Sequence, residues 1–303
     1  MSLRSSSWHL FRLFGIDVYL HWSWLIVAFI EIQARSHVYT SILWNALEFL
    51  ALFFIITMHE YGHSLACRSV GGTADRIVLW PLGGVAYVDP PPTAAAMLWS
   101  IAAGPLVNVA LFPVLAILSS LAPTLAAGNA NLIQLLHAVY WINLGLLIFN
   151  ILPVYPLDGG QILRSLLWFV LGRARSLMVA SAIGFIGVAA FFVLALQAHD
   201  IWLGAIAVFI LLNCWGGLRH ALELWRRSKL PRHADFACPW CRSAPLAGEF
   251  WQCGGCGQAF DGFRSAAACP HCGARFDQAR IRCTDCGRAH AFGEWVAPAL
   301  VVR

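Results

Sequence analysis

The stretch that decides the fold reads Ile55-Ile56-Thr57-Met58-His59-Glu60-Tyr61-Gly62-His63-Ser64-Leu65. Its two histidines stand four residues apart, so they share one face of a helix and can bind one Zn²⁺. The glutamate beside the first histidine can take a proton from water at the metal. From Trp44 to Ala66 nearly every other residue is apolar. We therefore expect the motif to lie inside a membrane, where ionisable groups mark function, and not in a soluble helix that matches by chance.

The composition supports this membrane interpretation. Hydrophobic residues make up 59% of the 303 residues and charged residues 12%, against roughly one quarter charged in a soluble domain. Fourteen tryptophans suit a protein with two membrane interfaces. Apolar runs of about 20 residues can cross a bilayer core of about 30 Å. Six such runs, the first of them short, cover Val18–Ile32, Leu43–Ala66, Ala94–Leu121, Leu132–Leu152, Leu177–Leu196 and Ile201–Leu224. No small-residue cleavage site follows the first run, so we interpret it as a retained helix.

Basic residues set the expected orientation. In one set of alternate loops Arg35 is the only basic residue. The other set contains Arg4, Arg12, Arg68, Arg76, Arg164, Arg173, Arg175, Arg219, Arg226, Arg227 and Lys229. Basic loops stay on the cytoplasmic side. We expect a multi-pass protein of the inner (cytoplasmic) membrane, with both termini in the cytoplasm and the metal in the cytoplasmic half of the bilayer.

A third metal ligand is predicted where the fourth run ends, in Asn150-Ile151-Leu152-Pro153-Val154-Tyr155-Pro156-Leu157-Asp158-Gly159-Gly160. Its prolines and glycines break the helix at membrane depth, which is tolerated where backbone is buried in protein or borders a wet cavity. Asp158 follows this break on the same side of the membrane as His63. Asp158 also suits a helix N-cap, but with HExxH in the same layer we favour a zinc ligand. Two imidazoles and one carboxylate leave a fourth position for water.

Several motifs in this order resemble the site-2 protease family of intramembrane zinc metalloproteases. Between Phe14 and Leu171 they are Gly15-Ile16-Asp17-Val18-Tyr19-Leu20-His21, His59-Glu60-Tyr61-Gly62-His63, Pro81-Leu82-Gly83-Gly84-Val85-Ala86, Ala103-Gly104-Pro105-Leu106-Val107-Asn108 and Asn150 to Gly160. The resemblance implies that His59, His63 and Asp158 bind the catalytic zinc and that Glu60 is the general base. It also implies the six-span layout of a bacterial subgroup, in which spans two to four form the active core and a cytoplasmic regulatory domain often follows.

The segment Ala74–Val88 alternates apolar residues around a turn and is interpreted as a β-hairpin that dips toward the site. In the family such a re-entrant element lies beside the active site, where it could pair with an extended substrate. Gly83 and Gly84 are therefore candidates for substrate binding, although a plain turn explains them equally well. Asn150 is a candidate by resemblance, and Asn108 is another, with a hydrogen bond between helices as its alternative.

After Lys229 the composition changes, and four CxxC pairs follow at nearly even spacing. Such pairs are typical of Cys₄ zinc sites, and a cytosolic location argues against disulfides. A tail with so few aliphatic residues is not expected to fold without metal. Pairing of consecutive pairs is favoured over interleaved pairing. This predicts two zinc ribbons, formed by Cys238, Cys241, Cys253 and Cys256 and by Cys269, Cys272, Cys283 and Cys286.

The sequence therefore predicts an all-α polytopic membrane enzyme over residues 1–229, with about six transmembrane helices and a small re-entrant β-hairpin, followed by a cytoplasmic double zinc ribbon over residues 230–303. With one catalytic and two structural zinc ions, it would hydrolyse peptide bonds in or near a transmembrane segment of a membrane protein, as in regulated intramembrane proteolysis. A regulatory protein is the expected partner of the ribbons. Nucleic acid is not favoured, because acidic residues are interspersed with the arginines. The alternative is a non-catalytic membrane zinc protein that recruits a partner through its ribbons.

Overall fold

The computed structural model describes residues 7–80, 83–126, 128–199, 201–276, 280–286 and 288–295. It divides into two compact units, Met1–Leu222 and Glu223–Arg303. Each unit has hydrophobic clusters of its own. The functional division that the sequence predicts at residues 229 and 230 stays a prediction.

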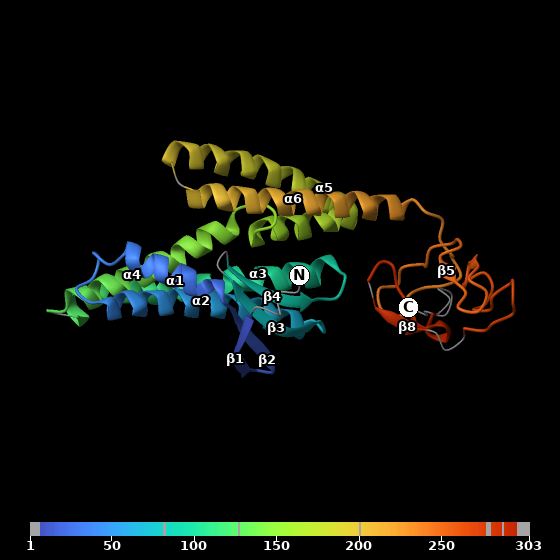
Figure 1. The fold of residues 1–303 in the computed structure, drawn as a ribbon, viewed down its shortest axis with the longest axis horizontal. Helices are drawn as coiled ribbons and strands as arrows, with labels where there is room; N and C mark the ends of the chain where they lie inside the picture. The colour runs from blue at the N-terminus through green and yellow to red at the C-terminus, as the bar shows by residue number, and fades with distance from the viewer. Residues whose placement is uncertain are drawn as a thin grey trace. The chain divides into compact units, whose positions relative to one another are not determined.

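Long apolar helices make up most of the first unit (Figure 1). The described residues contain five that are long and apolar enough to cross a membrane. They are α2 (Ile42–Ser69), α3 (Ala94–Leu125), α4 (Ala130–Ile151), α5 (Asp158–Ala198) and α6 (Ile201–Ser228). α3 packs against α2, α4 and α5. Large side chains such as Phe54 and Ile186 are exposed on these helices, which suits helices that face lipid rather than water.

The first expected span is shorter than predicted. Residues Val18 to His21 belong to strand β2 (Ile16–His21), and helix α1 (Ser23–Ala34) has 12 residues. At 1.5 Å per residue this helix is about 18 Å long, which is less than a bilayer core of about 30 Å. The start of the apolar run forms a strand because it pairs on both sides and alternates its burial, with Ile16 and Val18 fully buried.

A four-stranded sheet lies beside α2, in the order β1-β2-β3-β4 (Figure 1). β1 (Ser7–Leu13) and β4 (Gly83–Asp89) are its edges, and β3 (Thr73–Trp80) pairs with β2 in parallel and with β4 in antiparallel. The hairpin expected over 74–88 is therefore confirmed, whereas the sequence did not predict β1 and β2. Buried residues of β2 and β3 pack against Ile56 and Tyr61 of α2. The sheet is thus packed directly beside the HExxH turn.

Two glycines bring α3 against the same turn. A Cβ atom added to Gly62 would lie 2.6 Å from the Ala103 carbonyl oxygen, and one added to Gly104 would lie 2.2 Å from Nε2 of His63. Real side chains never approach so closely, so only glycine allows this packing. α5 bends at Gly172, whose φ of 77° and ψ of 169° are not helical. The bend separates a short helix that begins at Asp158 from the apolar run predicted over Leu177–Leu196.

The second unit contains two small antiparallel hairpins and a single 3₁₀ turn among its described residues. The hairpins are β5 (Trp251–Gln252) with β6 (Ala259–Phe260) and β7 (Arg280–Arg282) with β8 (Ala289–Ala291), and the turn η2 covers Phe292–Glu294. Its core is a cluster of aromatic rings and cysteines around Phe263 and Trp295. Such a small core needs further cross-links to be stable.

Candidate metal centre

Three predicted ligands from two distant parts of the chain meet inside the first unit. His59 and His63 lie on α2, and Asp158 is the first residue of α5. Nε2 of His59 lies 3.1 Å from Nε2 of His63 and 2.9 Å from Oδ2 of Asp158, and the same oxygen lies 3.3 Å from Nε2 of His63. Both histidines are about 95% buried. The three side chains therefore converge on one point in the protein interior.

The spacing of these atoms fits a tetrahedral zinc. Zn–N and Zn–O bonds of about 2.0–2.1 Å place neighbouring ligand atoms about 3.3 Å apart in a tetrahedron. The donor atoms of His59, His63 and Asp158 have this separation within a few tenths of an ångström. Asp158 does not act as a helix cap, because Leu157 occupies the N-cap position of α5 and no side chain caps it. The alternative role for Asp158 is therefore excluded in this structure.

Close backbone packing holds Asp158 at the centre. A Cβ atom on Gly159 would lie 2.2 Å from the Ile151 carbonyl oxygen, and one on Gly160 would lie 2.4 Å from the Tyr155 nitrogen. The two glycines thus let the chain fold back on the end of α4 before α5 begins. This geometry explains why the break at membrane depth is rich in proline and glycine, and it turns the Asp158 carboxylate toward α2.

The outer nitrogens of both histidines are also held. Nδ1 of His59 lies 2.6 Å from Oδ1 of Asn108, and Nδ1 of His63 lies 2.9 Å from the carbonyl oxygen of Ser100. An Nδ1–H donated to these oxygens leaves each Nε2 free for metal. Both acceptors belong to α3. α3 therefore fixes the orientation of the two imidazoles.

Asn108 forms the hydrogen bonds between helices that are the alternative to its predicted role in substrate binding. Its amide nitrogen donates to Oδ1 of Asn143 at 2.8 Å, and its carbonyl oxygen accepts from the Asn143 amide at 3.0 Å. Asn108 and Asn143 are fully buried. Asn108 therefore links His59 to α4, and its predicted role in substrate binding stays a prediction. Asn143 was missed by sequence reasoning, although an asparagine within the apolar helix α4 is itself a signal of a partner at depth.

Glu60 lies beside the metal ligands and contacts the hairpin. Its Oε2 accepts the backbone N–H of Ala86 at 3.0 Å, and its side chain is about 94% buried. A Cβ atom on Gly84 would lie 2.3 Å from Cγ of Glu60. Strand β4 therefore packs directly on the candidate base, and Gly84 is required for that approach. This contact gives Gly84 a role beyond that of a turn residue.

A cavity of about 520 Å³ opens onto His59, Glu60, His63 and Asp158. Its wall includes Gly84, Ala86 and Val88, which share one face of β4. Asn150 also lines the cavity, together with two amide residues that sequence reasoning missed, Gln161 and Asn213. Gly83, the remaining candidate for substrate binding, pairs with Trp80 in the hairpin.

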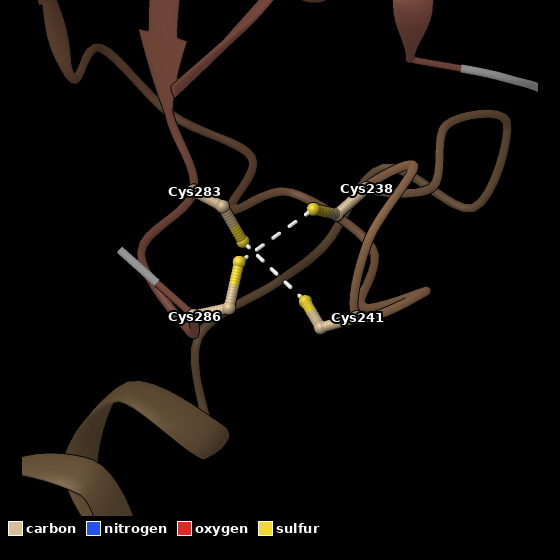
Figure 2. Close-up of side chains that lie close together, drawn as sticks. All are labelled: Cys238, Cys241, Cys283 and Cys286. Atoms are coloured by element: carbon tan, nitrogen blue, oxygen red, sulfur yellow. Dashed lines mark hydrogen bonds between the residues drawn. The ribbon is translucent and has the colours of Figure 1, made fainter. Parts of the chain in front are cut away.

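Two further sets of ligands lie in the second unit, and each contains four cysteines. Figure 2 shows Cys238 and Cys241 facing Cys283 and Cys286. The sulfur separations across this set are 3.8 and 3.6 Å, and across Cys253, Cys256, Cys269 and Cys272 they are 3.5 and 3.7 Å. Four thiolates at about 2.3 Å from one zinc lie about 3.8 Å apart. A disulfide requires a distance of about 2.05 Å between its two sulfur atoms. The observed separations are too long for that, so the geometry favours two Cys₄ zinc sites.

The predicted pairing of consecutive cysteine pairs is wrong. The first pair meets the fourth, and the second meets the third, so the inner site is nested within the outer one. The even spacing could not distinguish these arrangements. Contacts outside the cysteines favour nesting: Arg232 forms a two-pronged ion pair with Asp285 at 2.7 and 3.2 Å. The same ends pack together around Phe263 and Trp295.

Comparisons with known proteins point to one family of metalloproteases. The model of peptidase family M50 matches residues 47–125 and 121–194. The zinc metalloprotease MJ0392 of Methanocaldococcus jannaschii is 36% identical over 175 residues, which are 58% of this chain and 50% of that protein. A putative zinc metalloprotease of Synechocystis, sll0528, is 31% identical over 183 residues, or 57% and 47% of the two chains. The chain thus spans about half the length of these curated relatives.

A solved structure extends the similarity to the fold. The site-2 protease from Methanocaldococcus jannaschii is 30% identical, with a TM-score of 0.52, over 70% of this chain and 95% of that one. The chain therefore belongs to peptidase family M50, the family of the site-2 proteases. The predicted family and fold class are confirmed. Together with the five long apolar helices, this membership makes it a multi-pass membrane protein.

Proposed function

We propose that this protein is an intramembrane zinc metalloprotease that hydrolyses a peptide bond in or near a transmembrane segment of a membrane protein. The observation that carries the proposal is the convergence of His59, His63 and Asp158 beside the buried carboxylate of Glu60, on a cavity within apolar helices. Zinc bound by these three residues would acidify water and polarise the scissile carbonyl. The residues around it determine how that chemistry is used.

Glu60 serves as the general base. Its carboxylate lies next to His59 on the same helix turn and faces the cavity, so it can take a proton from water and return it to the leaving nitrogen. The Ala86 N–H holds one carboxylate oxygen. That hydrogen bond fixes the carboxylate in place while the other oxygen remains available for the proton.

The substrate binds as an extended segment beside β4. This strand is an edge of the sheet and borders the cavity with Gly84, Ala86 and Val88. A transmembrane helix has its carbonyl groups engaged in hydrogen bonds, so it must unwind before its peptide bond can be attacked. An edge strand offers the unwound segment new backbone partners. The amide of Asn150 lies on the same cavity and is a candidate for binding substrate backbone.

The proposal also covers the location of the protein, the number of its zinc ions and the role of the second unit. The excess of arginine on one set of loops supports an inner-membrane location with both termini in the cytoplasm. The three ligand sets support one catalytic and two structural zinc ions. At each of the two cysteine sites the four thiolates would complete a tetrahedral zinc shell and leave no position for water or substrate. The second unit therefore serves recognition, of the substrate or of a regulator, and cleavage is controlled through it.

Glu60→Gln tests the proposal, because the variant keeps all metal ligands but lacks the base. We expect cleavage of a transmembrane test substrate to fall by at least about 100-fold, with zinc content unchanged. Glu223→Gln is the matched control, since Glu223 is exposed near the end of α6, and it should cleave normally. Near wild-type cleavage by purified Glu60→Gln protein would exclude Glu60 as the base, whereas zinc-loaded wild-type protein that cleaves no transmembrane substrate would favour the non-catalytic alternative.

A further inference from the structure

Three carboxylates of the second unit, those of Asp261, Asp285 and Glu294, have internal partners, whereas Asp235 and Glu249 are exposed. Asp285 pairs with Arg232. Asp261 accepts hydrogen bonds from His233 and from the backbone N–H groups of Gly248, Phe263 and Arg264. Burial opposes ionisation of Asp261, but these donors hold the pKa of its carboxyl below the usual value. Glu294 accepts the Ala291 N–H and faces His290. These carboxylates therefore do not neutralise arginines elsewhere on the surface.

Two arginines border an aromatic groove that no described acidic residue lines, and the guanidinium of one of them, Arg280, donates to the Ala289 carbonyl oxygen. The groove has a volume of about 370 Å³, and Arg280 and Arg282 are the only charged residues among the described residues that line it. Both are exposed. Phe250, which is 60% exposed, and Trp251 contribute apolar surface to the same groove. Large exposed aromatic surface flanked by unpaired cations is typical of a binding site.

The groove borders β7, which pairs with β8 on one side and with no other strand among the described residues. Arg280 and Arg282 point to one face of the strand and Ile281 points to the other, yet all three line the groove. In the β7–β8 hairpin the Cys283 N–H donates to the Arg288 oxygen, and Ile281 pairs with His290 two residues further along. Backbone bonding alternates along an antiparallel pair, so Ile281 faces β8 while the backbone groups of Arg280 and Arg282 face away from it. No described residue pairs with those groups, so within this part of the chain they can accept another strand.

We propose that this groove, bounded by β7 and by Phe250 and Trp251, binds an extended acidic peptide segment of a partner protein by strand addition. The backbone of Arg280 and Arg282 pairs with the peptide, their guanidinium groups contact its carboxylates, and its apolar side chains enter the aromatic groove. A peptide is favoured over nucleic acid because two arginines neutralise too few phosphates for useful affinity, and the free strand edge has no counterpart in a nucleic acid. This binding does not depend on peptide-bond hydrolysis in the membrane unit.

The test uses the full-length, zinc-loaded chain in detergent. The probe is a fluorescein-labelled peptide of about ten residues with alternating glutamate and valine, and a lysine–valine peptide of equal length is its counterpart. Fluorescence anisotropy should show binding of the glutamate peptide and much weaker binding of the lysine peptide. The double variant Arg280→Glu and Arg282→Glu reverses the charge beside the groove. It should lower the affinity for the glutamate peptide by about 10-fold or more and raise the affinity for the lysine peptide.

Arg264→Glu is the control, because Arg264 is exposed but does not line the groove. It should leave binding of both peptides unchanged, and zinc content should be the same in every variant. Hydrogen exchange at the Arg280 and Arg282 amides should slow when the glutamate peptide is bound. Equal binding of the two peptides, an equal loss with Arg264→Glu, or tighter binding of a single-stranded oligonucleotide would overturn the proposal.

Discussion

Oδ1 of Asn108 lies 2.6 Å from Nδ1 of His59, on the side of the imidazole that faces away from the other ligands. Asn143 in turn holds Asn108 through two hydrogen bonds. The orientation of the first ligand of the HExxH motif thus depends on helices α3 and α4 as well as on α2. Partners of this kind fix which nitrogen of a histidine carries the proton and so govern metal affinity.

Asn108→Ala should lower the affinity of the membrane site for zinc by about 10- to 100-fold, because the His59 ring loses its acceptor. The measurement is retention of zinc against a chelator that leaves the wild-type protein fully loaded. Asn213→Ala is the control: Asn213 lines the cavity but bonds only to the Phe209 carbonyl oxygen of its own helix in the described contacts. Equal zinc retention by both variants would show that Asn108 does not position His59.

Asn143→Ala should lower the zinc affinity of the membrane site by less than Asn108→Ala does, in the same chelator assay. Asn143 acts on His59 only through Asn108, so its removal loosens the ring without deleting the acceptor. Adding Asn143→Ala to Asn108→Ala should therefore cost little more than Asn108→Ala alone. Fully additive losses would contradict a serial arrangement of the three residues.

Asp158→Ala should remove one zinc ion per chain and abolish cleavage, while both cysteine sites stay filled. The side chain supplies the only anionic oxygen among the three described ligands, and its loss leaves two imidazoles. Metal analysis with a thiol-sensitive probe separates the two kinds of site. If Asp158→Ala protein keeps its full zinc content and still cuts substrate, Asp158 is not a ligand.

Gly84→Ala should abolish or severely reduce cleavage with zinc retained. The new Cβ would lie 2.3 Å from Cγ of Glu60, so the base or strand β4 must shift. Gly145→Ala is the matched control, because a Cβ atom there meets nothing within 4 Å. Gly145 lies in α4, and alanine is the better helix former, so that variant should be at least as stable. Normal activity of Gly84→Ala would exclude tight packing of β4 on Glu60.

Pairs of cysteine substitutions distinguish nested from consecutive sites. Cys238→Ser and Cys283→Ser each should remove one zinc, and the double variant should still lack only that one, because both residues serve the outer site. Cys238→Ser combined with Cys253→Ser should remove two. Consecutive pairing predicts instead that the Cys238/Cys283 double variant loses two zinc ions and the Cys238/Cys253 double variant loses one. Mass spectrometry of the intact metal-loaded protein gives the number of bound zinc ions directly.

The sequence predicts the candidate metal ligands that the structure brings together, because the pattern that marks each of them is local. The spacing of His59 and His63 is fixed by one helical turn, and the break around Asp158 is marked by proline and glycine. The alternation over 74–88 likewise predicts the hairpin without any tertiary information. In each case the signal lies within a few neighbouring residues, where backbone geometry alone sets the outcome.

Other features depend on contacts between distant segments. The pairing of Asn108 with Asn143 requires the register of α3 against α4, which no local pattern contains. Strand β2 lies at the start of an apolar run and becomes a strand only because β1 and β3 flank it. The nested cysteine sites follow from contacts such as Arg232 with Asp285. These are the places where tertiary structure overrides sequence spacing.

Nesting also gives the tail an order of assembly. The inner site joins Cys253 and Cys272, which are 19 residues apart, whereas the outer site joins Cys238 and Cys286, which are 48 apart. Closing the shorter loop costs less chain entropy, and once it is closed the outer ends have far less free chain between them. We expect the inner zinc to load first as the chain emerges from synthesis. Loss of the outer zinc alone should open the tail at its base and leave the inner site as a small folded tip. Because β7 leads directly into Cys283 and Trp295 packs in the same cluster, zinc starvation would then disrupt the groove in a graded, reversible way.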